Sequence, residues 1–240
     1  MQSTICVHTS DKHYTQKTSP EFSTSPIGKT KPNMDALGGM IWDSSETLYW
    51  SLDSDYKWLT KDEQTNIIKS AFLETSLATP LKIQQRRKET ADPQIHINWL
   101  GKKDYPYFTS ESILACAYGP ASGIGGDVTM NADVLWLLRK TPLTAKEAKE
   151  KGYIGEYSQA NNEIRYYDPV HTMKHEAGGH ACGLKHLESP ALMKLAIMYP
   201  YYNGLRNFGN ADIEYVQQLY GKSTKIDRIS KLVQNKMGKI

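Results

Sequence analysis

The chain has 240 residues and a formal net charge of +3, with 39% apolar and 23% charged residues. This length allows one large domain or two small ones, and so small a charge does not indicate a nucleic-acid partner. No apolar run is long enough to span a membrane, and the first residues lack the apolar stretch of a signal peptide. The composition is ordinary for a globular protein.

The first 36 residues differ in composition from the rest. They are rich in Ser, Thr, Lys and Pro and poor in apolar side chains, which predicts a flexible leader or pro-segment. The three cysteines of the chain, Cys6, Cys116 and Cys182, include no CxxC pair. An odd number without such a pair predicts neither a disulfide framework nor a cysteine-based metal site.

Strand and helix patterns follow one another from residue 48 onward. Thr60 and Glu63 form a capping box for an amphipathic helix over about residues 61–76, which Thr79-Pro80 ends. Apolar, aromatic or alternating segments predict strands at residues 48–52, 81–85, 95–99, 113–118 and 127–132, with the last at an edge of the sheet. The glycine-rich residues 119–126 are expected to form a tight loop.

The second half is more polar. Residues 140–165 are rich in Lys and predict a solvated insertion with a short helical patch at 144–151. A helix is expected to begin near Pro169 and to break at Gly183. Asn210 is expected to cap a further helix. Residues 222–240 form a basic tail with an apolar stripe at helical spacing, which predicts a solvated terminal helix.

The segment HEAGGHACGLKH holds His175, Glu176, His180 and His186. Neutral imidazoles are good zinc ligands, and a catalytic site uses three protein ligands and leaves a fourth position for water. A carboxylate next to the first ligand can take a proton from that water. The segment therefore predicts a catalytic zinc held by the three histidines, with Glu176 as general base.

The spacing of the first two histidines is unusual. His175 and His180 are five residues apart, so in a regular α-helix their side chains would diverge by about 140°. A single-turn π-bulge at Gly178 and Gly179 would return both histidines to one side, and we favour this explanation. Two alternatives remain. His171 and His175 could form the pair, with Thr172 in place of the acid, or the site has lost zinc.

Several motifs in one order resemble the matrixins of the metzincin clan. Residues 180–186 look like the second half of the zinc motif HExxHxxGxxH. Residues 196–202 (AIMYPYY) are similar to the matrixin Met-turn and pocket wall, and residues 212–221 to the final helix. Upstream, residues 114–118 and 123–127 resemble the segment that folds over a calcium site. The resemblance covers about residues 40–221.

This resemblance implies an α+β fold. It has a mixed, mostly parallel, five-stranded twisted sheet with an antiparallel edge strand and three helices, and the active-site helix is followed by a Met-turn subdomain. The expected organisation is a leader at residues 1–36, a catalytic domain at 37–221 and a basic tail at 222–240. An extracellular location is suspected from the resemblance, although no signal peptide is visible. A monomer is expected.

The resemblance also assigns individual residues. Met198 is the expected Met-turn residue, chosen over Met193 because Tyr-Pro-x-Tyr follows it. Pro200 and Tyr202 are expected to wall the pocket for the residue after the cleaved bond. The structural zinc of the matrixins is not expected in this protein, because Cys116 and Thr129 stand where the family has histidines.

A calcium site is one interpretation of the glycine-rich loop. Carboxylates of Asp92 and Asp127 and carbonyl groups near Gly123 and Gly125 could form its oxygen shell. The other interpretation is a glycine turn that needs no ion.

The expected function is hydrolysis of peptide bonds in protein substrates. One zinc ion lowers the pKa of its water to about 7, and Glu176 moves the proton to the leaving amine. The substrate strand is expected to pair with residues 127–131. The alternative is an inactive matrixin-like module in which the extra residue misaligns the helix, so that the cleft binds peptides without cutting them.

Overall fold

The computed structural model describes residues 4–8, 41–87, 90, 92–109, 113–138, 144–150, 157–158, 163–164, 166–224, 227–229 and 231–232. Most of the predicted leader and most of the predicted C-terminal tail therefore lie outside the described residues. Within the tail, 227–229 and 231–232 are helical. None of the helices in the described ranges has the length and apolar character needed to cross a membrane.

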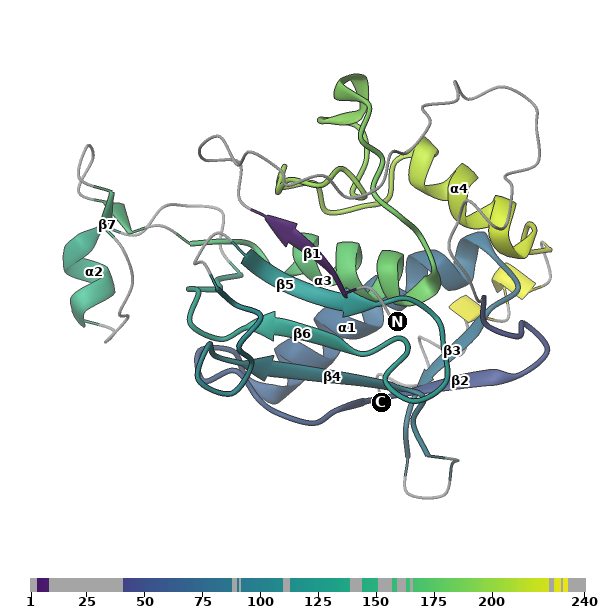
Figure 1. Ribbon diagram of the computed structural model, residues 1–240, viewed down its shortest axis with the longest axis horizontal. Helices are drawn as coiled ribbons and strands as arrows, with labels where there is room; N and C mark the ends of the chain where they lie inside the picture. The colour runs from purple at the N-terminus through teal and green to yellow at the C-terminus, as the bar shows by residue number, and fades with distance from the viewer. Residues whose placement is uncertain are drawn as a thin grey trace.

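A six-stranded sheet organises the molecule, in the order β1-β5-β6-β4-β2-β3 (Figure 1). The strands are β1 (Thr4–His8), β2 (Thr47–Leu52), β3 (Lys82–Gln85), β4 (Ile95–Leu100), β5 (Ile113–Tyr118) and β6 (Val128–Asn131). The neighbours from β6 to β3 pair in parallel, whereas β5 is antiparallel to β6. The predicted mixed sheet with one antiparallel strand is confirmed. The composition of the leader did not predict β1, which adds a sixth strand.

The predicted edge position of residues 127–132 is wrong. β6 lies inside the sheet, paired with β4 on one side and with β5 on the other. The polar Asn131 of this strand has partners there: its side-chain amide donates to the Ile113 carbonyl at 2.8 Å, and its backbone carbonyl accepts from Trp136 Nε1 at 2.8 Å. Because buried polar groups with such partners carry little penalty, a strand with a polar residue such as Asn131 can lie inside the sheet.

Two helical segments cover one face of the sheet (Figure 1). The first, α1 (Lys61–Ala78), begins at the predicted capping box of Thr60 and Glu63. It buries Ile68, Ala71 and Phe72 in the main core with the strands, at 2% exposure or less. The second segment starts with α3 (Pro169–Met173), which contacts α1. This layer holds the predicted metal-binding residues against the sheet.

The remaining elements are smaller. α4 (Asn210–Tyr220) packs on α1 and begins one residue after its N-cap, Gly209, so Asn210 is the first helical residue and not the cap. The predicted polar insertion contains α2 (Ala145–Glu150) and a hairpin of β7 (Tyr157–Ser158) and β8 (Glu163–Ile164). Figure 1 shows α2 and β7 standing away from the sheet.

Candidate metal centre

The helix that carries the histidines changes its winding inside the motif. After α3 it continues as a π-helical turn, η1 (Lys174–Gly179), and then as a 3₁₀ turn, η2 (His180–Cys182). The His180 N–H is shared between the carbonyls of Glu176 and His175, four and five residues back. The π-bulge predicted from the spacing is therefore present. The chain then leaves the helix at Gly183, whose φ of 92° is the left-handed conformation that glycine tolerates.

Both glycines of the π-turn are packed closely, a role the sequence did not reveal. A Cβ on Gly179 would lie 2.1 Å from Met198 Sδ, and one on Gly178 would lie 2.9 Å from the Ala71 carbonyl oxygen of α1. A π-turn also leaves a carbonyl without its usual helical partner. The Gly178 carbonyl accepts from the Thr75 hydroxyl at 2.6 Å, so α1 stabilises the bulge directly.

The π-turn and the turn at Gly183 together bring three imidazoles to one point. The distances between Nε2 atoms are 3.0 Å for His175 and His180, 3.1 Å for His175 and His186, and 3.2 Å for His180 and His186. Tetrahedral ligands about 2.05 Å from a zinc ion are about 3.3 Å apart. Within the described ranges these histidines are the one group of three or more His, Cys, Asp or Glu side chains that could hold a metal ion.

Backbone carbonyls fix the orientation of two of the rings. His175 Nδ1 lies 2.6 Å from the Ile197 carbonyl, and His180 Nδ1 lies 2.7 Å from the Leu184 carbonyl. Since a carbonyl only accepts, each Nδ1 carries the proton and each Nε2 offers a lone pair to the common centre. Lone pairs that face one another repel unless a cation lies between them, so this donor set fits a zinc ion.

Burial keeps these imidazoles in the neutral, ligating form. It lowers the pKa of His180 to about 4. The pKa of His175 lies well below its usual value, first because of burial and then because of the neighbouring His180 and His186. Glu176, the predicted general base, follows His175 in the same turn and is completely buried.

The alternative pairing of His171 with His175 is not used. His171 is completely buried, and its Nδ1 bonds the Leu205 carbonyl at 2.9 Å. Its ring centroid lies 6.3 Å from that of His175 and 4.7 Å from that of Tyr202. It lies outside the three-histidine cluster, and burial lowers its pKa to about 4.

The two methionines proposed for the Met-turn differ in burial. Met198 is completely buried and packs against Gly179, whereas Met193 is 45% exposed. Asp212, at the start of α4, accepts the backbone N–H groups of Ile197 at 2.8 Å and Met198 at 3.0 Å. Asp212 thereby holds the turn whose Ile197 carbonyl orients His175. This positioning role could not be predicted from the sequence, in which an acid in the first turn of a helix is a weak signal.

A buried ion pair anchors the other side of the π-turn. The Lys174 ammonium contacts the Glu74 carboxylate of α1 and the Arg206 carbonyl, and only 5% of the Lys174 side chain is exposed. This pair could not be predicted from the sequence either, because neither residue stands in a recognisable spacing. Removing one partner of a buried pair leaves an uncompensated charge, so the pair ties η1 firmly to α1.

The predicted pocket residues lie next to the histidine-bearing helix. The ring of Tyr202 meets that of His171 edge to face, and its hydroxyl accepts from the Asp168 N–H at 3.1 Å. Pro200 is half-buried. Their role as a substrate pocket stays a prediction.

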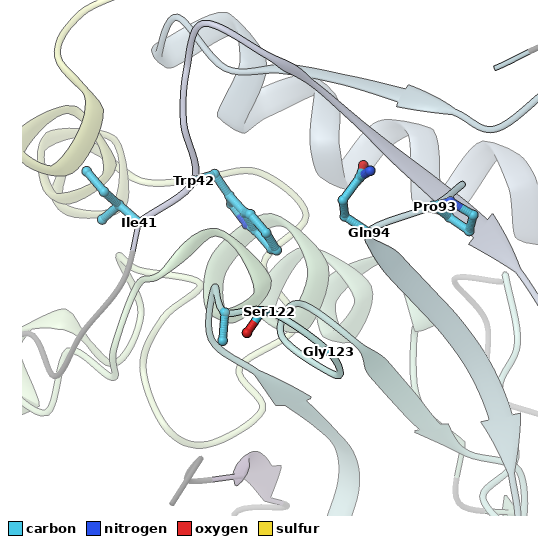
Figure 2. Close-up of a pocket in the computed structure, with 7 residues that line it drawn as sticks. Ile41, Trp42, Pro93, Gln94, Ser122 and Gly123 are labelled. Carbon is cyan, nitrogen blue, oxygen red and sulfur yellow. The ribbon is translucent and has the colours of Figure 1, made fainter. Parts of the chain in front are cut away.

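The predicted calcium ligands have partners within the protein. The Asp92 carboxylate pairs with Arg86 at 2.9 Å, and Asp127 accepts the His96 N–H at 2.9 Å. A cavity of about 420 Å³ lies beside the glycine-rich loop, and none of the three clustered histidines lines it. Figure 2 shows Trp42 facing Ser122 and Gly123 across it. Calcium binding stays a prediction.

Comparison with known proteins places these features in a family. The chain is 27% identical to the interstitial collagenase of Oryctolagus cuniculus over 189 residues, which are 78% of this chain and 34% of the collagenase. It is 29% identical to matrix metalloproteinase-15 of Homo sapiens over 199 residues, which are 78% of this chain and 26% of that relative. A probable matrix metalloproteinase of Invertebrate iridescent virus 3 is 28% identical, over 75% of this chain and 45% of its own length.

The chain thus spans less than half of the length of these relatives. A family model adds to the pairwise likeness, since residues 41–221 match the peptidase family described as Matrixin. That range contains the five predicted strands, the π-turn and all three clustered histidines. The chain belongs to the matrixin family of metallopeptidases.

Proposed function

We propose that this protein is a zinc-dependent endopeptidase. The observation that carries the proposal is the convergence of three Nε2 atoms to within 3.2 Å of one another, in a matrixin domain, next to the buried Glu176. His175, His180 and His186 would hold the ion. Bound zinc supplies Lewis-acid polarisation of the scissile carbonyl and of water.

Glu176 is the group that moves the proton. A carboxylate in this completely buried position accepts a proton from the attacking water and delivers it to the leaving amine. The inactive alternative requires that the extra residue misaligns the histidines. The π-turn accommodates the extra residue, so it argues against this alternative.

The substrate is a protein or peptide chain in extended form. Such a chain binds a sheet by adding a strand to an exposed edge. With β6 inside the sheet, the strand next to the histidines is β5, which contacts both η1 and η2 and whose outer side is paired with β1 in this structure. We take the outer side of β5 as the substrate edge. Pro200 and Tyr202 would wall the pocket for the residue after the cleaved bond.

The test is Glu176→Gln, with the exposed Glu188→Gln as the matched control. Glu176→Gln should keep about one zinc per chain, measured by elemental analysis, and lose about 10²–10⁴-fold in the hydrolysis of a fluorogenic peptide. Glu188→Gln should retain both the bound zinc and the peptide hydrolysis. Equal activity in Glu176→Gln would refute the mechanism, and purified protein that holds no zinc even after metal is supplied would refute the proposed function.

A further inference from the structure

The N-terminal strand lies on the edge where the substrate is expected. β1 runs antiparallel along β5, with Thr4 opposite Tyr118 and Val7 opposite Ala115. It also contacts η1, the turn that carries His175 and Glu176. Figure 1 shows β1 alongside β5, in front of the layer that contains α3.

With β1 in place, β5 has no free edge. Its other side already pairs with β6 through residues 115–117. An extended peptide that adds to a sheet needs the backbone N–H and C=O groups of an unpaired edge. β1 uses those groups of β5, so it competes directly with a substrate strand.

The cysteines indicate how β1 is held. Cys116, in the middle of β5, is disulfide-bonded, whereas Cys182 is a free, buried thiol. Cys6 is the third cysteine of the chain and the register partner of Cys116 across the ladder. Directly opposed residues of an antiparallel pair have Cα atoms about 4.5–5.5 Å apart, which is within the range that a disulfide spans. The odd number of cysteines, which indicated no disulfide framework, did not reveal the disulfide of Cys116.

We propose that β1 is an internal blocking strand. A Cys6–Cys116 disulfide holds it on the substrate edge of β5, and reduction of that bond releases it. This inference rests on the proposed function for the meaning of that edge. Blocking by β1 does not require a cysteine thiolate on the metal, because both sulfur atoms are in the disulfide.

The disulfide matters because pairing of a single short strand is weak. A covalent tether turns the pairing of β1 into an intramolecular event with a high effective concentration, which can strengthen binding by about 10²–10⁴-fold without any new contact. The loss of the tether leaves the strand connected only through the intervening chain. A substrate strand can then displace it.

The step that opens the edge is a two-electron reduction. A phosphine reductant attacks one sulfur, the S–S bond breaks, and water hydrolyses the phosphonium adduct. The products are two cysteine thiols and one phosphine oxide, so electrons and atoms balance. In a cell a dithiol would do the same through a mixed disulfide and leave as a cyclic disulfide.

The test uses the full zinc-loaded chain. Peptide mapping without reductant should recover Cys6 linked to Cys116. Treatment with a phosphine should raise the hydrolysis of an extended fluorogenic peptide at least about tenfold. Cys6→Ser should show the raised rate without treatment and gain nothing further from phosphine, which controls for effects of the reductant on the metal. An oxidised wild type as active as Cys6→Ser would overturn the inference, as would a map without the linked peptide.

A second measurement separates this inference from the proposed function. Hydrogen exchange of the β5 amides should be at least about tenfold faster in Cys6→Ser than in the oxidised wild type, because the covering strand dissociates more often. If no form of the protein hydrolyses peptides, the proposed function fails while this exchange difference still reports the blocking strand. Equal exchange rates of the β5 amides in Cys6→Ser and in the oxidised wild type would overturn the inference of a blocking strand.

Discussion

In Gly179→Ala, the steric cost of the added methyl group opposes the higher helix propensity of alanine. In an ordinary helix this change stabilises a protein by about 0.5–1 kcal/mol, since alanine is the better helix former. Gly179 has a negative φ of −99°, so a Cβ meets no left-handed strain. That Cβ would nevertheless lie 2.1 Å from Met198 Sδ, in a side chain that is completely buried. We expect packing to dominate.

The magnitude follows from the overlap. Adding one methyl to a filled core costs about 1–3 kcal/mol, and 2 kcal/mol corresponds to a Tm decrease of about 4–8 °C in a domain of this size. The assay is denaturant unfolding at a fixed zinc concentration, with zinc content measured in parallel. Gly119→Ala is the matched control, because its Cβ would have no atom within 4 Å.

A double-mutant cycle decides whether Met198 is the cause. Met198→Ala alone should cost about 2–5 kcal/mol. Combined with Gly179→Ala, it should cost at least about 1 kcal/mol less than the sum of the two single changes, since the added methyl then enters the vacated space. Strict additivity, or a Gly179→Ala variant more stable than the wild type, would refute the reasoning.

Two further predictions concern the same helix. Thr75→Val should cost about 1–3 kcal/mol, because it leaves the Gly178 carbonyl without its 2.6 Å partner; Thr75→Ser, which keeps the hydroxyl, should cost less, and equal losses would contradict the role of that bond. The pKa of buried His171 is lowered to about 4 from its usual 6.5, so its stabilising contribution is present above pH 6.5 and is lost as the pH falls towards 4, where only the unfolded chain takes up the proton. In this window His171→Leu should flatten the pH dependence of the unfolding free energy by about 1 kcal/mol per pH unit, and an unchanged slope would show that His171 does not titrate as its burial requires.

Local patterns in the sequence were sufficient for several elements. The Thr60 and Glu63 capping box located the start of α1, because both reciprocal hydrogen bonds lie within four residues. The five-residue interval between His175 and His180 required a π-turn if the two were to share an ion, and the structure has one. Such features depend on spacing along one segment, which a sequence displays directly.

Features that depend on contacts between distant segments could not be predicted from the sequence. The burial of β6 between β4 and β5, and the pairing of β1 with β5, depend on which strands meet, and the local pattern of residues 127–132 placed the edge at the wrong strand.

The supports of the metal centre are equally non-local. Thr75 reaches Gly178, and Asp212 holds the backbone of Ile197 and Met198. The sequence by itself identified the three candidate ligands of this centre and their spacing. Only the tertiary structure decided what holds them in place and what covers the neighbouring edge, because hydrogen bonds and packing between segments 14 to 103 residues apart leave no periodic trace in the chain.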